Sequence, residues 1–371
     1  MRKTYEYRLR PTPAQERRLL ATLDACRHVY NWGIEDRKIL WQYAKCGTSF
    51  YDQSAYLKHL KAERPWLATV HAHPLQDALR RVDRAFQAFF RRVKAGQAPG
   101  YPRFKGRDWY DSFTMKEWGN GCGVDGKRLA LSKIGRLRVV WHRPLVGTVK
   151  TCTVKRRADG WYVLLSAEIA DVPLRAETTP VGVDVGLATF AALSTGEKIA
   201  NPRHFRVAAQ GLAQAQRVVS KRICGSTRRR KARAILARRH LAVARTRKDF
   251  HFKTAKSLAD RFNPIVVENL NVAGMGRHPT LAKSIHDAGW AQFLGILSRS
   301  AASAGAAYMA VEARGTSQTC SACGTIVPKT LAERIHRCEA CGLVLDRDEN
   351  AARNILKRGW AGPSARRLRA S

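Results

Sequence analysis

Four cysteines near the C-terminus have the spacing of a metal site. They form two Cys-x-x-Cys pairs with fourteen residues between the pairs: Cys320, Cys323, Cys338 and Cys341. Four thiolates on two short turns suit the tetrahedral coordination of Zn²⁺. Gly324 and Gly342 follow the pairs and supply the backbone freedom that such turns need. We therefore predict one structural zinc ion rather than disulfides, because nothing else in the chain indicates a secreted protein.

Three carboxylates occupy similar places in segments that could converge. Asp184 interrupts the apolar run VGVDVG, Glu268 ends the apolar run PIVVE, and Asp348 lies seven positions after the last of the four cysteines. An ionised aspartate among valines is costly unless a cation or hydrogen bonds satisfy it. Three converging acids match two-metal phosphodiester chemistry, in which two ions about 3.5–4 Å apart activate water and stabilise the leaving oxygen. Oxygen ligands favour Mg²⁺ or Mn²⁺.

Each of these acids also has a plainer interpretation. In the run Asp346–Glu349, Asp346 is a good helix N-cap with Glu349 completing a capping box, and Asp348 would gain from the helix dipole. Gly182 and Gly186 flank Asp184, and they let either a ligand or another backbone approach closely. Taken singly, the acids therefore leave both a structural and a catalytic role open.

Residues 205–248 form two predicted basic helices with a break near 225–226. A charged helix can simply be a solvated face, but so dense a run of one sign repels itself unless an anion neutralises it. We therefore predict that the second helix contacts nucleic-acid phosphates through Arg228, Arg229, Arg230, Lys231, Arg233, Arg238 and Arg239.

The composition supports a polyanion partner. The chain has 371 residues, with 67 Lys and Arg against 29 Asp and Glu, a net charge of +38 and a pI near 10.7. Such an excess predicts nucleic-acid binding. No long apolar run or signal peptide is evident, which argues against a membrane protein. Five scattered cysteines indicate the reducing cytosol, so we predict a cytoplasmic protein.

The sequence also predicts the strands and helices that carry these residues. Alternation over 4–10 predicts a strand, and the region 12–95 reads as helical, with helices from Pro13 and around 52–62 and 73–95. Short strands with turn signals over 109–178 predict a small β-barrel, to which the strand 4–10 could add. Beyond 178, strands around the acids alternate with helices, including one predicted helix from about 284 to 305.

Eight stretches, in order over nearly the whole chain, resemble the TnpB family of transposon-encoded RNA-guided nucleases, which are related to the type V CRISPR effectors. They are YEYRLRPTPAQ, CRHVYNWGI, PRFKGRDWYDSFT, VGVDVGLATFAALSTG, IVVENLNVAGM, SIHDAGWAQFL, TSQTCSACG and CGLVLDRDENAARNI. The resemblance implies a RuvC-like, ribonuclease-H-like α/β nuclease domain whose acids are Asp184, Glu268 and Asp348. It also implies a guide RNA encoded at the transposon end and a double-stranded DNA target with an adjacent motif.

The expected fold class is thus multidomain α+β. The resemblance places a wedge-like β-barrel at 1–10 and 96–178, and a helical recognition domain at 11–95 inserted into it. It places the nuclease domain at 179–315 and 346–360, with the basic helices at 205–262 and a zinc ribbon inserted at 316–345, and it leaves 361–371 as a basic, disordered tail.

The expected function is RNA-guided, Mg²⁺-dependent DNA cleavage. Two alternatives stay open from sequence: a transposase that performs strand transfer with the same carboxylates, since one fold can support both chemistries, and a non-catalytic RNA-guided nucleic-acid-binding protein. The presence of all three acids argues against the second.

Overall fold

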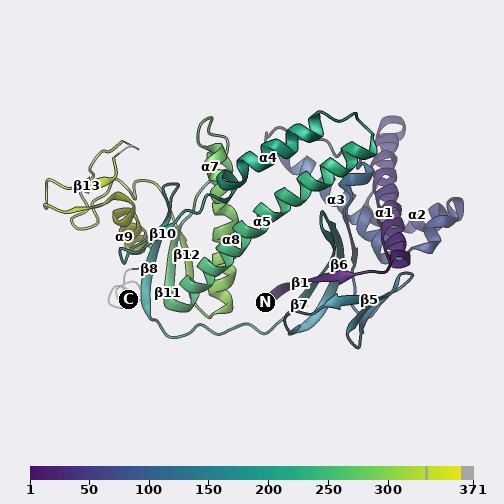
Figure 1. Ribbon diagram of the computed structural model, residues 1–371, viewed down its shortest axis with the longest axis horizontal. Coiled ribbons are helices and arrows are strands. Elements are labelled where there is room, and N and C mark those ends of the chain that lie inside the picture. The colour runs from purple at the N-terminus through teal and green to yellow at the C-terminus, as the bar shows by residue number, and fades with distance from the viewer. Residues whose placement is uncertain (331–332, 361–371) are drawn as a thin grey trace. The chain divides into compact units, whose positions relative to one another are not determined.

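The computed structural model describes residues 1–330 and 333–360, so the predicted tail at 361–371 lies outside the described residues. The chain divides into two compact units between Ala170 and Asp171. Each has its own apolar core and its own main sheet, as Figure 1 shows in purple to teal for the first unit and teal to yellow for the second. No helix in the described part of the chain is long and apolar enough to cross a membrane.

The first unit is built on a seven-stranded antiparallel sheet in the order β2-β6-β7-β1-β5-β4-β3. Its strands are β1 (Arg2–Arg10), β2 (Ser112–Met115), β3 (Cys122–Asp125), β4 (Arg128–Leu131), β5 (Gly135–Val140), β6 (Thr148–Arg157) and β7 (Gly160–Glu168). The predicted first strand is confirmed, and Tyr5, Tyr7 and Leu9 are its buried face. It pairs with β7 from Arg2 to Leu9 and with β5 from Arg8 to Arg10. The start of the chain therefore forms the centre of a sheet whose other strands come from 112–168.

Three helices separate β1 from the rest of that sheet: α1 (Pro13–Ile39), α2 (Phe50–Glu63) and α3 (Ala72–Lys94). Thr12 is the N-cap of α1 and forms a complete capping box with Gln15. Each of the three helices is followed by a shorter helical segment: the π-helix η1 (Leu40–Ala44), and the 3-10 helices η2 (Pro65–Thr69) and η3 (Arg107–Trp109).

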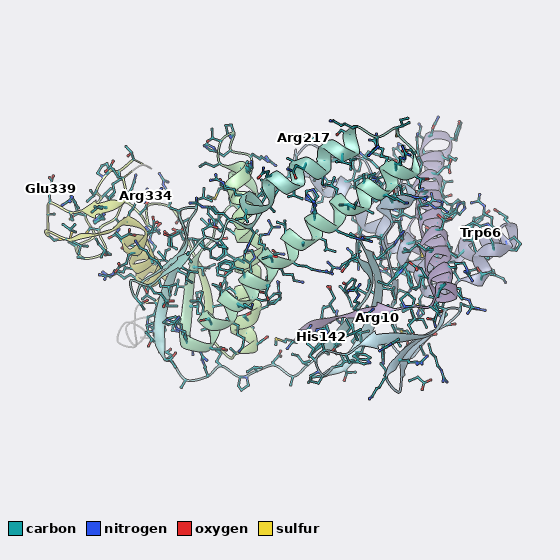
Figure 2. The ribbon with its side chains drawn as sticks, viewed as in Figure 1. Arg10, Trp66, His142, Arg217, Arg334 and Glu339 are labelled. Atoms are coloured by element: carbon teal, nitrogen blue, oxygen red, sulfur yellow. The ribbon has the colours of Figure 1, made fainter. Side chains whose placement is uncertain are left out.

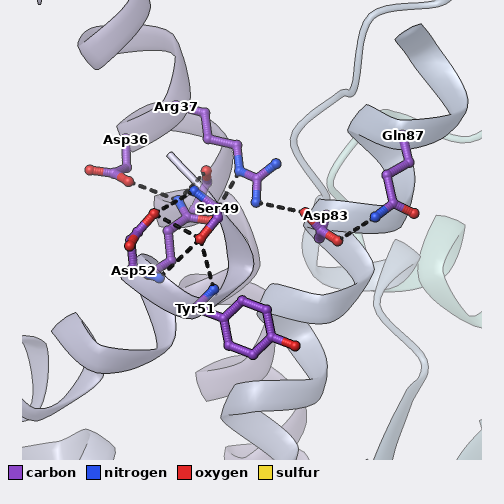
Figure 3. Close-up of polar contacts among 9 residues, drawn as sticks. Asp36, Arg37, Ser49, Tyr51, Asp52, Asp83 and Gln87 are labelled. Carbon is purple, nitrogen blue, oxygen red and sulfur yellow. Dashed lines mark hydrogen bonds and ion pairs between the residues drawn. The ribbon is translucent and has the colours of Figure 1, made fainter. Parts of the chain in front are cut away.

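A polar network ties the three helices together (Figure 3). Arg37 of α1 donates from Nε to Gln53 of α2 (3.0 Å) and from Nη2 to Asp83 of α3 (3.1 Å). The second oxygen of Asp83 accepts from Gln87 (2.8 Å). Because Arg37 and Asp83 are mostly covered, this satisfied pair orients the helices without leaving a buried charge alone.

The second unit carries a five-stranded mixed sheet in the order β10-β9-β8-β11-β12. The strands are β8 (Thr179–Val185), β9 (Thr189–Leu193), β10 (Lys198–Ala200), β11 (Phe262–Glu268) and β12 (Tyr308–Val311). Strands β8, β11 and β12 run parallel, and β9 runs antiparallel to both of its neighbours. A hairpin, β13 (Ile335–Arg337) with β14 (Val344–Asp346), stands apart from this sheet.

Helices cover both faces of the five-stranded sheet. Its helices are α4 (His204–Ser220), α5 (Thr227–Arg261), α6 (Val272–Met275), α7 (Ala282–Ala288), α8 (Trp290–Ser303) and α9 (Arg347–Gly359). On one face, Val181, Val183, Ile265 and Val267 share a buried core with residues of α5 and α8. Alternate strand residues point to the opposite face, and there α9 packs on β8 and β11. The sheet is thus the middle layer of the unit (Figure 1).

One predicted helix is wrong. The continuous helix expected from about 284 to 305 is two helices, α7 and α8, and they break at Gly289. Its φ of +66° is a left-handed conformation that cannot continue a right-handed helix and that glycine adopts without strain. The apolar residues on both sides of the break share one helical period, which is why the pattern alone did not reveal it.

Candidate active site

The period of two in β-strands places two of the three predicted acids on one face of the sheet. Gly182 pairs with Val266 across the parallel strands β8 and β11, and the next pair is Val183 with Val267. Asp184 and Glu268 each lie two positions beyond the first pair, so both point to the face that α9 covers. Both also lie at the carboxyl ends of their strands, where parallel sheets bind their ligands.

Helix α9 brings the third acid to the same edge. Asp346 caps the helix as predicted, accepting from the backbone N–H of Asp348 (3.0 Å) and Glu349 (3.2 Å). Because Asp346 is the cap, the carboxylate of Asp348 is left for another role. The helix runs back over β8, and a Cβ placed on Gly186 would lie 4.0 Å from Asp348 Oδ2.

Gly182 explains how α9 can lie so close to the sheet. A Cβ at this position would collide with the carbonyl oxygen of Ala352 and lie 2.8 Å from the backbone N of Leu356. Gly359 fits against Val266 in the same way, since a Cβ there would come within 2.5 Å of a Val266 methyl carbon. The close approach predicted from the glycines beside Asp184 is, at Gly182, that of another backbone.

Negative charge accumulates where the three acids meet. Burial, together with the carboxylates of Glu268 and Asp348, raises the pKa of Asp184 well above its usual value, against the opposing effect of Arg347. Arg347 is hydrogen-bonded to Asp348, with 3.2 Å between Nη2 and Oδ1. The acids thus lie close enough to perturb one another, and one guanidinium offsets part of their repulsion.

Glu268 is the most enclosed of the three, with 9% of its surface exposed. Burial raises its pKa, whereas the hydroxyl of Thr316, which donates to Glu268 Oε1, and the charge of Arg358 both lower it. Thr316 was not predicted as a site residue, and neither was Arg347. Both lie inside stretches that resemble the family, TSQTCSACG and CGLVLDRDENAARNI, but their types alone carry no metal or acid–base signal.

The acids suit divalent cations by donor chemistry. Carboxylate oxygens are the ligands that Mg²⁺ and Mn²⁺ prefer, and a cation would stabilise the ionised form of Asp184 against the burial and the neighbouring carboxylates that raise its pKa. Among the described residues, however, the set whose ligand atoms all lie within 4.8 Å of one another is the four cysteines, not the three acids.

The four cysteines form a compact cluster. The sulfur atoms of Cys320 and Cys341 are 3.7 Å apart, and those of Cys323 and Cys338 are 3.5 Å apart. Tetrahedral Zn–S bonds of about 2.3 Å require sulfurs separated by about 3.8 Å, so the donor set fits one zinc ion.

The two turns that carry the cysteines are built alike. Gly324 N donates to the Cys320 carbonyl (3.0 Å), and Gly342 N donates to the Cys338 carbonyl (2.8 Å). Both glycines have positive φ, +83° and +72°, which confirms the predicted need for backbone freedom. The second turn lies between β13 and β14, and β14 leads directly into α9.

The predicted phosphate-binding residues lie on α5. Arg228, Arg230, Lys231, Arg233, Arg238 and Arg239 are exposed, and Arg229 is half-buried. Ser226 caps the helix by accepting from Arg229 N (3.1 Å), and Arg229 in turn donates to the Arg222 carbonyl (2.9 Å). Figure 2 shows basic side chains along both α4 and α5, including Arg217 on α4. Helix α5 presents the dense basic surface that the sequence predicts, whereas the arginines of α4 are Arg206 and Arg217 alone.

Three family models match parts of the chain. Residues 165–278 match OrfB_IS605, described as a probable transposase, and residues 290–355 match the TNB domain of Cas12f1-like proteins. Residues 1–46 match a model described as a helix-turn-helix domain, although here the structure has strand β1 followed by the long helix α1 and the π-helix η1.

Relatives that align with nearly the full length of this chain show which family it belongs to. A protein of Streptomyces pristinaespiralis assigned as an RNA-guided DNA endonuclease is 36% identical, over 97% of this chain and 90% of its own length. The chain belongs to the TnpB (OrfB_IS605) family. A second TnpB-family protein, from Escherichia coli K12 and with the same assignment, is 29% identical over 97% of this chain and 92% of its own length.

A solved structure shares the fold of this TnpB-family chain. The mini-RNA-guided endonuclease CRISPR-Cas_phi3 aligns with a TM-score of 0.51 at 9% identity, covering 96% of this chain and 92% of that one. At so low an identity the likeness concerns the fold alone. It agrees with a multidomain α+β protein whose second unit contains a RuvC-like nuclease region and a four-cysteine zinc-ribbon-like domain.

Proposed function

We propose that this protein is an RNA-guided DNA endonuclease of a transposable element. Two whole-length relatives carry that assignment, and the net charge of +38 suits a protein that holds RNA and DNA together. The single observation that carries the catalytic part is the convergence of Asp184, Glu268 and Asp348 at one edge of the five-stranded sheet, where the other two acids raise the cost of ionising Asp184.

The proposed reaction is hydrolysis of a DNA phosphodiester. Asp184, Glu268 and Asp348 would hold two Mg²⁺ or Mn²⁺ ions, which when bound supply an activated water and stabilise the leaving oxygen. The protein's own part is positional. The sheet fixes Asp184 and Glu268, α9 fixes Asp348, and Arg347 adds a positive charge where negative charge is concentrated. In this proposal the carboxylates would hold the metal ions and would form no covalent bond to the substrate.

The zinc ion is proposed to be structural. Four thiolates occupy all four positions of a tetrahedral ion, which leaves no position for water or substrate. The ribbon at 316–345 then serves to place the start of α9, because β14 ends at the residue that caps this helix.

The partners are proposed from the family and the charge. A guide RNA encoded at the transposon end would pair with one strand of double-stranded DNA that carries an adjacent motif, so that base pairing reads sequence while the protein contacts mainly backbone. The basic side chains of α5, from Arg228 to Arg239, are proposed phosphate contacts. A cytoplasmic location, where thiols stay reduced, fits the nine cysteines.

We further propose the domain assignment. Residues 1–10 and 96–178 would form the wedge, 11–95 the recognition domain, 179–315 and 346–360 the nuclease domain, and 316–345 the ribbon. The division between Ala170 and Asp171 lies close to the boundary between the wedge and the nuclease domain.

The experiment starts from the native element. The protein is expressed with its flanking DNA, and RNA that stays bound after a high-salt wash is sequenced. One dominant RNA from the element's end with a variable 3′ segment is expected. This complex should then cut DNA complementary to that segment, and Asp184→Ala should bind the DNA without cutting it. Random cellular RNA, or equal cutting by the variant, would contradict the proposal.

Strand transfer is the second candidate, because the OrfB_IS605 family is described as a probable transposase. The same reaction separates the two. An endonuclease releases DNA ends, whereas a transposase joins the element's end to new DNA, which sequencing across junctions detects.

A further inference from the structure

The segment between β12 and the first zinc-binding turn passes directly over Glu268. Within it, Thr316 has only 4% of its surface exposed, and its hydroxyl oxygen lies between Glu268 Oε1 and the Ala313 carbonyl, 3.1 Å from the latter. A hydroxyl has one proton to donate, and an ionised carboxylate is the stronger acceptor. When Glu268 is ionised, the proton of Thr316 therefore points at it.

Two buried asparagines of α9 fix the backbone on which Thr316 sits. Asn354 donates from Nδ2 to the carbonyl oxygens of Thr316 (2.8 Å) and Thr319 (2.6 Å). Asn350 donates to the same Thr319 oxygen (2.8 Å) and accepts from Ser321 N (2.9 Å). Both asparagines are almost fully buried, so these bonds are shielded from competing water.

The same segment continues into the zinc cluster. Ser321 follows Cys320, and the hydroxyl of Thr319 donates to the Gly315 carbonyl (2.9 Å), which closes a turn that contains Thr316 and ends next to the cysteine. Lys357 of α9 also donates to the Ser321 carbonyl. A displacement of the cysteine turn cannot stay local, because the chain from Thr316 to Ser321 is hydrogen-bonded at several points to α9, whose first turn carries Asp348.

We propose that Thr316 is a positioning residue that holds Glu268 ready for a divalent cation. The zinc-binding turn sets the place of Thr316, through backbone that α9 fixes with Asn350 and Asn354. A glutamate has three rotatable side-chain bonds, so a donor that engages Oε1 selects one arrangement of them and leaves Oε2 for a cation. The inference rests on the proposed function only in that Glu268 is taken as a cation ligand.

The test compares Thr316→Val, which keeps the shape and removes the hydroxyl, with Thr316→Ser, which keeps the hydroxyl. Mn²⁺ binding to the full-length protein–RNA complex is measured by electron paramagnetic resonance. The ions bound by an Asp184→Ala complex are subtracted, because RNA binds Mn²⁺ as well. Partners of metal ligands typically change metal affinity by about 10–100-fold. We expect that loss for Thr316→Val, recovery to within about threefold for Thr316→Ser, and one zinc per chain in both.

The outcomes separate this inference from the proposed function. If Thr316→Val retains its zinc and binds Mn²⁺ with wild-type affinity, the inference about Thr316 is wrong. The proposed nuclease function is not affected by that result. A wild-type complex that binds Mn²⁺ but cuts no DNA overturns the function, while the Val and Ser variants still decide the role of Thr316. If Thr316→Val does not accumulate, Thr316→Ala removes the same hydroxyl without a branched side chain and is judged by the same result.

A double variant tests the link to α9. Asn354→Leu removes both amide donations and should weaken Mn²⁺ binding in the same direction as Thr316→Val. Because both changes act on the same oxygen of Glu268, the variant that combines Thr316→Val with Asn354→Leu should bind Mn²⁺ no more weakly than the weaker-binding single variant. Losses that add in full would show two independent effects and overturn the link.

Discussion

The two candidate metal sites of the second unit are assembled in opposite ways. The cysteines come from two four-residue turns close together in the chain, and their sulfurs already lie within 4.8 Å of one another. The carboxylates come from β8, β11 and α9, more than 160 residues apart from first to last, and they lie in reach of one another without forming so compact a set.

This difference follows from chemistry and chain length. Two short turns bring the cysteine sulfurs together, whereas burial and the carboxylates of Glu268 and Asp348 raise the pKa of Asp184, which disfavours three ionised acids at short range. A local site depends on turn geometry, and a long-range site depends on every interaction that holds its elements together.

Removing one cysteine should have the largest effect. We expect Cys338→Ser to lose its zinc, because structural zinc sites of this class contribute about 10–16 kcal/mol and depend on all four ligands. Zinc content measured by mass spectrometry should fall from one per chain to near zero, and DNA cleavage should fall with it. The matched control is Cys224→Ser, an exposed thiol outside the cluster, which should retain zinc and activity. Full zinc occupancy in the first variant would contradict the four-ligand site.

The second-largest effect is expected from a change that pushes α9 away from the sheet. Gly182→Ala places a methyl group against the Ala352 carbonyl, so α9 must move and carry Asp348 with it. We expect a stability loss of about 1–3 kcal/mol, as for other overpacked cores, and a loss of cleavage of at least about tenfold while zinc is retained. Gly295→Ala in α8 is the control, because its Cβ would meet only an Arg299 side chain at 3.6 Å. Equal melting and cleavage for both variants would mean that the close approach is not needed.

The basic residues of α5 lie along a single helix and do not depend on distant elements. Removing some of them should therefore weaken RNA binding in steps rather than abolish it. Replacing Arg228 and Arg230 with Gln should weaken RNA binding and reduce the slope of log affinity against log salt by about 0.7–0.9 for each phosphate that is no longer neutralised. Filter binding at several salt concentrations measures this. Lys256→Gln is the control, since Asp260 already pairs with that lysine at 2.7 Å. An unchanged slope for the double variant would place the phosphates elsewhere.

The smallest expected effect is a gain in stability at the carboxylate site. The folded-state pKa of Asp184 is raised by burial and by the two other acids, so the folded protein holds this proton more tightly than the unfolded chain does. The stability of the wild type should therefore fall as pH rises from about 4, the usual aspartate pKa, towards the raised value.

Asp184→Asn removes that cost. In magnesium-free buffer near neutral pH it should melt above wild type, by about 2–4 °C for each kcal/mol of relieved repulsion. The difference should shrink as pH approaches about 4, which differential scanning fluorimetry can follow. A variant that melts below wild type at neutral pH would show that the repulsion is compensated.

Much of the local structure could be predicted from sequence. The strand with Tyr5, Tyr7 and Leu9, the capped start of α1, the strands that carry Asp184 and Glu268, and the helix cap at Asp346 all depend on neighbours a few residues away. The cysteine cluster belongs with them, because two turns of fixed geometry bring its ligands together. The catalytic roles of the three acids stay predictions.

Which distant residues meet could not be predicted from the sequence and is seen in the folded structure. In that structure β1 lies in the middle of a sheet whose other strands come from 112–168, and the backbone of α9 lies so close to Gly182 that no side chain fits there. The helix breaks at Gly289, and Thr316 donates a hydrogen bond to Glu268. A periodic pattern shows which face of an element is apolar, but it does not show which element covers that face or in what register. Those choices depend on interactions between residues far apart in the chain, where the free energy of packing, rather than local propensity, selects the partner.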